Sequence, residues 1–270
     1  MSEATAARAE DPAAAWAQVL RPAAGAAPLP RMIAAQAWLE ARLLVRNGEQ
    51  LLLTLLIPVL LLVAFSLEKN LIKGTGVNFL VPGIIALAVM STAFTSQAIA
   101  TGFERRYGVL KRLGATPLPR GGLIGAKIVT VVGVEVLQAA IILAAGLGLG
   151  WRPAASPAAA AWVVVLILAG TAAFSGLALL MAGTLRAEAT LAAANLVYLL
   201  LLGVGGIIFP LSRFPHGWQP VLLALPSGAL SHGLRSVLAA SGGFPARDLL
   251  VLACWAVAGI ALAARTFRWD

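Results

Sequence analysis

The stretch FERRYGVLKRLGATPLPR, Phe103–Arg120, is a short charged segment between two long apolar ones. Placed on a helix, its residues divide into an apolar stripe of Phe103, Tyr107 and Leu110 and an opposite side of Glu104, Arg105, Gly108, Lys111 and Arg112. Thr116-Pro117 and Pro119 should end this helix, because proline lacks an amide hydrogen and disfavours helical geometry in the preceding residue. The stretch predicts a short amphipathic helix; the alternative is a solvated basic loop at a membrane edge.

The chain as a whole is too apolar for a soluble domain. It has 270 residues, of which 60% are hydrophobic and 11% are charged, and its mean hydropathy is +0.90. We therefore expect an all-α polytopic membrane protein. The formal net charge is +9, but the bases lie between apolar blocks, which indicates topology and contact with anionic lipid and no nucleic-acid partner. The single cysteine, Cys254, excludes an intramolecular disulfide and is expected to be an inert buried thiol.

Residues 1–30 are rich in Ala and Pro and predict a flexible tail. A helical period follows in residues 31–48, which predicts a helix lying in the membrane interface and closed by Gly48. Its predicted apolar face consists of Ile33, Ala37, Trp38, Ala41, Leu44 and Val45, and its other faces carry Arg31, Gln36, Glu40, Arg42 and Arg46.

Residues 49–270 contain six apolar stretches near the length that a bilayer requires, about 17–25 residues. They are Leu51–Leu67, Phe79–Ala100, Leu123–Leu149, Ala158–Leu185, Leu191–Leu211 and Leu249–Ala264. Of the 20 Lys and Arg, six lie in segments that alternate to the outside, namely Lys69, Lys73, Arg152, Arg213, Arg235 and Arg247, so 20 − 6 = 14 lie inside. This asymmetry predicts a multi-pass protein of the inner (plasma) membrane with both termini in the cytoplasm.

The segment 210–248, between the fifth and sixth stretches, is moderately apolar and broken by proline and glycine. Pro220–Leu225 and Ser227–Ala240 predict two short helices that are too brief to span. We expect a re-entrant or interfacial hairpin on the outer side; the alternative is an ordinary structured loop.

Together these features resemble the permease subunit of type-2 ATP-binding-cassette (ABC) exporters, particularly the drug-resistance-like bacterial permeases, over Arg31 to Arg268. The most specific match is the charged loop, at Glu104, Arg105, Gly108, Leu110, Lys111, Arg112, Leu113, Thr116, Pro117 and Leu118. The outer hairpin matches at Phe209, Pro210, Trp218, Gln219, Pro220, Pro226, Leu234 and Arg235. Gly114 departs from the pattern, since the family often carries a larger residue there.

The resemblance implies a coupling helix over 103–113, seated in a groove of a separate ATPase subunit. Its residues would include Glu104, Arg105, Arg106, Tyr107, Gly108, Leu110, Lys111 and Arg112. The connecting helix beside it would use Trp38, Glu40, Arg42 and Arg46. The chain has no GxxxxGK[ST] phosphate loop, so it is not an enzyme by itself, and ATP and Mg are expected in the partner subunit.

Inside the spans, polar residues mark further sites. By the resemblance, the second and fifth spans line a central path, with Met90, Thr92, Phe94, Thr95 and Gln97 on one and Asn195, Tyr198, Leu199 and Leu202 on the other; the alternative for each is helix packing. Glu135 is the single acid deep in a span, either in a cavity or gate or as a hydrogen-bond acceptor between helices. The two histidines, His216 and His232, have no Cys or acidic cluster nearby, so no metal site is predicted.

The resulting hypothesis is a permease, paired with a second identical or related copy, that exports a hydrophobic or amphipathic drug, lipid or secondary metabolite. A lipid-linked glycan or polymer exporter is the alternative within the family. An ATP-independent carrier or a membrane scaffold is the alternative outside it, although a carrier should show an internal repeat and more buried titratable residues.

Overall fold

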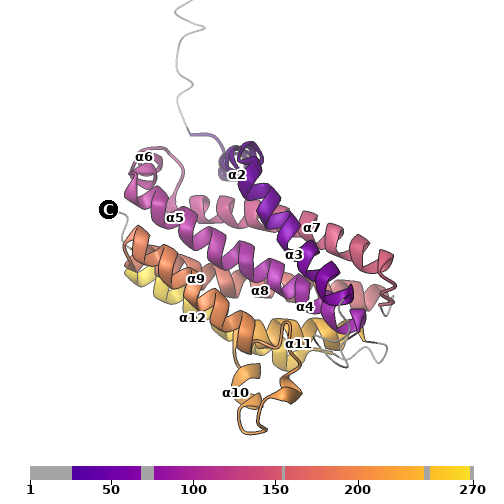
Figure 1. Cartoon of the computed structure of the whole chain (residues 1–270). Coiled ribbons are helices and arrows are strands. Elements are labelled where there is room, and N and C mark those ends of the chain that lie inside the picture. The colour runs from indigo at the N-terminus through magenta and orange to yellow at the C-terminus, as the bar shows by residue number, and fades with distance from the viewer. Residues whose placement is uncertain (1–25, 68–75, 154–155, 240–243, 268–270) are drawn as a thin grey trace, which may run out of the picture.

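The computed structural model describes residues 26–67, 76–153, 156–239 and 244–267, and every element within them is a helix (Figure 1). Five helices are long and apolar enough to cross a membrane: Val77–Arg106, Gly121–Gly148, Pro157–Thr184, Ala187–Val204 and Ala246–Thr266. The all-α polytopic membrane fold is therefore confirmed. The first predicted span corresponds to α3 (Gly48–Leu67), of which Thr54–Leu67 is a shorter apolar helix, so the count of six spans stays a prediction.

The second span is one continuous rod and forms the centre of the bundle. It consists of α4 (Val77–Val89), the π-helix η1 (Met90–Ser96) and α5 (Gln97–Arg106). In its most apolar window 78% of the residues are buried, against 22–50% for the other four candidate spans. Around it lie α7 (Arg120–Gly148), α8 (Pro157–Thr184) and α9 (Ala187–Val204), and α12 (Ala246–Thr266) packs on α8.

The amino-terminal helix α2 (Leu29–Arg46) lies against α7. It begins two residues before the predicted start, and residues 1–25 of the predicted tail lie outside the described residues. Ala37 is buried against the bundle, whereas Trp38 and Val45, on the same predicted apolar face, are 71% and 63% exposed. A single neighbouring helix covers only one stripe of α2, and the place of this helix in the membrane interface stays a prediction.

The fifth span is shorter than predicted. α9 ends at Val204, seven residues before Leu211, and Gly205 to Ile208 continue as buried non-helical chain. Gly206 has φ +66°, a left-handed conformation that favours glycine. The Ser231 hydroxyl donates to the Gly205 carbonyl at 2.8 Å, which satisfies the buried backbone.

The predicted hairpin helices are present as α10 (Gln219–Leu223) and α11 (Pro226–Leu238), after a 3₁₀ turn at Leu211–Arg213. α11 is buried along most of its length and packs on α4, α8 and α12. The Arg235 guanidinium fastens it to α4, with Nε donating to the Phe79 carbonyl at 3.1 Å and Nη2 to the Ile207 carbonyl at 2.7 Å. The hairpin therefore enters the helical bundle.

One acid lies beside His232, because the start of α12 brings the Asp248 carboxylate within 3.0 Å of its Nδ1. A single carboxylate is not an acidic cluster, so it does not contradict the prediction made for the histidines. The expectation of a buried thiol at Cys254 was wrong, because Cys254 is exposed and the buried residues of α12 are Asp248, Leu252, Ala256, Gly259 and Ala263.

The ends of several helices meet near α6 (Val109–Gly114). The Leu29 and Leu118 side chains both lie against Gly122, at the start of α7, so α2 begins at this end of the bundle. Phe267, the last described residue, lies against Gly183 near the end of α8, and α12 ends on the same side of the bundle as α6 in Figure 1.

Candidate functional site

The charged stretch folds as two helices joined by a tight turn. α5 ends at Arg106, Tyr107 caps it, and α6 begins at Val109. Gly108 has φ +70° and cannot continue the helix, so the single helix expected over 103–113 is wrong. Before the break the apolar stripe holds partly, because the rings of Phe103 and Tyr107 stack with centroids 6.0 Å apart. The predicted stop is confirmed, as α6 ends at Gly114, before Thr116-Pro117.

The break divides the predicted coupling residues into exposed and inward-facing ones. Arg106, Tyr107, Lys111 and Arg112 are exposed, and Leu110 is buried. Glu104 and Arg105, expected at the head of the exposed polar face, face the bundle instead, because α5 still packs on α8 and α9 there and Lys127 of α7 donates to Glu104. The exposed part of the turn therefore carries three cations and one aromatic ring.

The connection between α8 and α9 holds the turn in place. Arg105 Nη2 donates to the Leu185 carbonyl at 2.5 Å, and Arg106 forms an ion pair with Glu188 at the start of α9. A pocket of about 420 Å³ lies here, lined by Gly102, Arg105, Arg106, Gly108, Lys111, Arg186, Ala187 and Glu188. A displacement of the turn must therefore move the ends of both α8 and α9.

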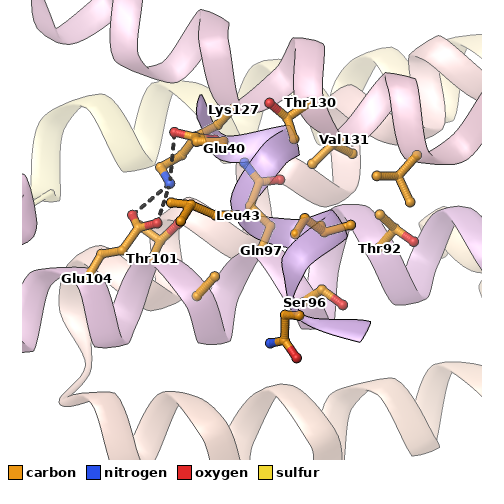
Figure 2. A pocket seen from close by; sticks show the side chains of 14 residues that line it. Glu40, Leu43, Thr92, Ser96, Gln97, Thr101, Glu104, Lys127, Thr130 and Val131 are labelled. Carbon is orange, nitrogen blue, oxygen red and sulfur yellow. Dashed lines mark hydrogen bonds and ion pairs between the residues drawn. The ribbon is translucent and has the colours of Figure 1, made fainter. Parts of the chain in front are cut away.

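On the other side of α5, the side chain of Lys127 connects three helices, α2, α5 and α7. Lys127 of α7 lies with Nζ 2.6 Å from Oε2 of Glu104 in α5 and 3.6 Å from Oε1 of Glu40 in α2 (Figure 2). We call these three residues the Lys127 cluster. The lysine side chain is 8% exposed, so the group is shielded from solvent. Burial raises the pKa of Glu40, although Lys127 and the Gln36 amide, which donates to Glu40 at 3.0 Å, act in the opposite direction.

The Lys127 cluster forms one wall of a cavity of about 260 Å³ between α2, the η1–α5 segment and α7 (Figure 2). Apolar side chains complete it, among them Leu43, Leu44, Val131 and Val134. Gln97 and Thr101 also line it, and the buried amide atoms of Gln97 and hydroxyl of Thr101 have no hydrogen-bond partner in the described structure.

The other connecting-helix residues take no part in this cavity. Trp38, Arg42 and Arg46 are all exposed on α2, away from α7. Of the four predicted there, Glu40 alone faces the bundle. Its position follows from the pairing with Lys127, which no pattern within α2 could reveal.

The predicted substrate path is divided between two environments. Met90 and Phe94 are fully buried, and Phe94 packs on Phe174 with ring centroids 6.4 Å apart. Thr92 and Gln97 line the cavity beside α7, and the Thr92 hydroxyl donates to Gln138 at 2.9 Å. In α9, Asn195 and Leu199 are exposed while Tyr198 and Leu202 are half-buried, as is Thr95 of η1. Within one chain these residues do not line a common surface, because side chains of the central rod point to all its neighbours.

Glu135 is buried at 2% exposure between α7 and α8, where it accepts a hydrogen bond of 2.5 Å from the Thr171 hydroxyl. This is the contact expected for an acid that joins two helices. Its second oxygen, Oε1, has no partner among the described residues. One turn further on, Gln138 donates to the Thr54 carbonyl of α3 at 3.0 Å.

The family profile of the ABC-2 type transporter matches residues 33–239, which is most of the chain and includes α2, the α5–α6 turn and α11. The chain belongs to the ABC-2 type transporter family. Its members' membrane domain is the transmembrane component of an ABC transporter and not a catalytic domain. Among curated proteins, none matches the chain.

Several residues of this ABC-2 transporter's site were missed from the sequence. Lys127 was counted only as an inside positive charge, and Ser96, Thr101 and Thr130 were not singled out. A lysine seven residues inside an apolar helix is a signal that could have identified the Lys127 cluster, because such a charge requires a buried partner.

Proposed function

We propose that the chain is the membrane subunit of an ABC exporter in which two permease copies work with two separate ATPase subunits. ATP and Mg bind in those subunits, and the cargo is a hydrophobic or amphipathic drug, lipid or secondary metabolite that leaves the cytoplasm or the inner leaflet. The observation that carries the proposal is the exposed cationic turn at Arg106–Arg112, joined directly to the spanning helices.

The charge distribution supports an orientation in the inner membrane with this turn on the cytoplasmic side. Arg105, Arg106, Lys111, Arg112 and Arg186 gather where α5, α6 and α9 meet. At the other end, Arg152 follows α7 by four residues and Arg247 lies at the start of α12. A cluster of bases at one end favours the cytoplasmic side. Both described chain ends lie toward that end, so both termini are proposed to be cytoplasmic.

The α5–α6 turn has the properties of a docking element for an ATPase. Lys111 and Arg112 point outward, where they can pair with acidic side chains of a partner, and Tyr107 offers an aromatic anchor that is 65% exposed. Because Arg105 and Arg106 hold α8 and α9 while Glu104 holds Lys127, a partner that moves α6 also moves the ends of α7, α8 and α9.

A second permease copy is proposed to cover the outer face of α9. Leu196, Leu199 and Leu200 are 57–61% exposed there, and the Asn195 amide is exposed beside them. The Asn195 amide nitrogen donates to the Leu191 carbonyl at 3.0 Å, and a facing helix or a central path can pair with the rest of this polar group better than lipid tails can. Cargo of mixed polar and apolar character suits this surface better than a highly charged molecule.

The test is a mild-detergent pull-down of the tagged chain from its native cell, followed by mass spectrometry. A stoichiometric partner with a GxxxxGK[ST] loop is expected. The double variant Lys111→Glu/Arg112→Glu should lose that partner and remain folded, since both side chains are exposed. The matched control, Arg152→Glu/Arg247→Glu, changes two exposed arginines at the other end and should retain it. A chain that comes down alone, under conditions that preserve other complexes, would favour an ATP-independent carrier or a scaffold.

A further inference from the structure

The cavity beside the Lys127 cluster contains buried polar groups that the fold itself does not use. Gln97 is 5% exposed and Thr101 is 1% exposed. The amide nitrogen and oxygen of Gln97 and the hydroxyl of Thr101 have no partner within the described structure, and Figure 2 shows both side chains beside Glu104 and Lys127. A buried polar group without a partner costs about 1–3 kcal/mol, so two such residues lining one cavity indicate a molecule that hydrogen-bonds to them.

The charges around the cavity are unequal. Its described lining has two carboxylates, Glu40 and Glu104, and one cation, Lys127. The Lys127 ammonium lies 2.6 Å from Glu104 and 3.6 Å from Glu40, so it is 1.0 Å closer to Glu104. The charge of Glu40 is therefore the less well neutralised of the two. Burial also disfavours this charge, which is why it raises the pKa of Glu40. A positive charge placed beside Glu40 would complete the pairing.

We propose that this cavity binds an amphipathic molecule with a single ammonium group. The ammonium donates hydrogen bonds to Glu40 and to the Gln97 side-chain oxygen, and the apolar body lies along Leu43, Val131 and Val134. The volume of about 260 Å³ accommodates a small arylalkyl chain or the head and first carbons of a lipid. Identification of this ligand as cargo rests on the proposed function, whereas its binding does not.

The first experiment measures binding to the purified full chain in maltoside micelles by titration calorimetry. The probe is 4-phenylbutylammonium, and 4-phenylbutanol is its uncharged control for partition into micelles. Glu40→Gln should weaken binding of the ammonium by at least about tenfold, because it removes one partner of a desolvated charge pair. Glu188→Gln is the matched control, since it removes an acid that is 62% exposed and outside this cavity, and it should bind the probe as the unchanged chain does.

Two further variants separate binding from folding. Gln97→Leu should weaken the probe's binding and raise the melting temperature, because it removes buried polar atoms that have no partner. Lys127→Met should tighten binding, because Glu40 and Glu104 then have no lysine partner and are both available to pair with the probe's ammonium. A cavity with a purely structural role predicts neither result.

The pH dependence gives an independent readout. The groups that face Glu40 are Gln36 on its own helix, Lys127 from α7 and Glu104 from α5. Protonation of Glu40 removes the charge that the ammonium needs, so the probe's affinity should fall as the pH is lowered through the raised pKa of Glu40. The Glu40→Gln variant should lose most of this dependence.

The source of the ammonium is decided by competition. If added phosphatidylethanolamine displaces the probe and phosphatidylglycerol does not, the cavity holds a lipid head group; if neither does, it holds a free amphiphile. Equal affinity for the amine and the alcohol, or equal binding by Glu40→Gln and Glu188→Gln, would overturn the proposal. Because this assay contains no ATPase, a failure to bind the ammonium selectively would not contradict the exporter proposal. Conversely, a pull-down without an ATPase partner would not contradict the proposal that the cavity binds an ammonium.

Discussion

Gly108 is the residue on which the geometry of the α5–α6 turn depends, and its replacement gives the most direct test. Its φ of +70° places it in the left-handed region, and an added Cβ would meet nothing within 4 Å. Gly108→Ala therefore adds backbone strain without a steric collision. For an L-residue other than glycine this conformation costs roughly 1–2 kcal/mol. Since 1.4 kcal/mol is a factor of ten, the equilibrium between the observed turn and other conformations should shift about 5- to 30-fold.

Gly114→Ala is a control in the same short helix. An added Cβ at Gly114 would also meet nothing within 4 Å, but the φ of Gly114 is not positive, and it is the last residue of α6. Alanine should be tolerated there or stabilise the helix end by up to about 1 kcal/mol. The family pattern often carries a larger residue at this position, which agrees with that expectation.

The assay is amide hydrogen exchange over residues 103–114, together with binding of the ATPase subunit. Gly108→Ala should exchange faster in this segment and bind the ATPase more weakly, while exchange in α8 remains unchanged. Gly114→Ala should show neither change. If the two variants behave alike, the left-handed turn is not what holds α6 in place.

Three more variants test other contacts of the fold. Arg235→Lys should lower the free energy of unfolding by about 1–3 kcal/mol, because a lysine cannot donate to both the Phe79 and Ile207 carbonyls, and thermal unfolding measures it. Gly176→Ala should cost about 1–3 kcal/mol in the same assay, since a Cβ there would lie 3.0 Å from the backbone nitrogen of Ile260 in α12, whereas Gly203→Ala, with open space around it, should not. Glu135→Gln should reduce transport more than the amount of folded protein, and equal losses would assign this acid to packing with Thr171.

Much of the helical architecture follows from local chemistry that is visible in the sequence. Apolar runs of span length, bounded by charges, marked the spanning helices, and the short helices of 210–248 began beside Pro220 and Pro226 as predicted. The break at Gly108 was missed because a glycine leaves an amphipathic pattern unchanged. Its left-handed conformation is required only because α6 must turn while Arg105 and Arg106 stay on α8 and α9.

The candidate site was harder to predict from the sequence than the helices were, because it depends on which faces of the helices meet. The family resemblance implied that Thr92 and Gln97 line a path with the fifth span, whereas within one chain they line a cavity beside α7 and α2. Part of the reason is η1, since a π-helix turns less per residue than an α-helix and changes which side chains share a face. Glu104 and Lys127 are 23 positions apart, and their pairing at 2.9 Å requires knowledge of how α5 and α7 pack.

The central rod gives the exporter proposal a mechanical basis. It runs from Val77 to Arg106 in 30 residues, or about 45 Å at 1.5 Å per residue. At one end Glu104 and Arg105 tie it to Lys127 and Leu185, beside the cationic turn. At the other, the Phe79 carbonyl accepts from Arg235 of α11. An ATPase that displaces α6 would therefore act on the hairpin of α10 and α11 through one buried helix. The π-helical segment η1 lies in the middle of this helix, where the Thr92 hydroxyl donates to Gln138 of α7. It is the segment in which the helix can most readily change its number of residues per turn. A disulfide or proline placed at η1 should then uncouple ATP hydrolysis from transport without preventing ATPase binding, whereas loss of binding would show that the rod is needed for assembly itself.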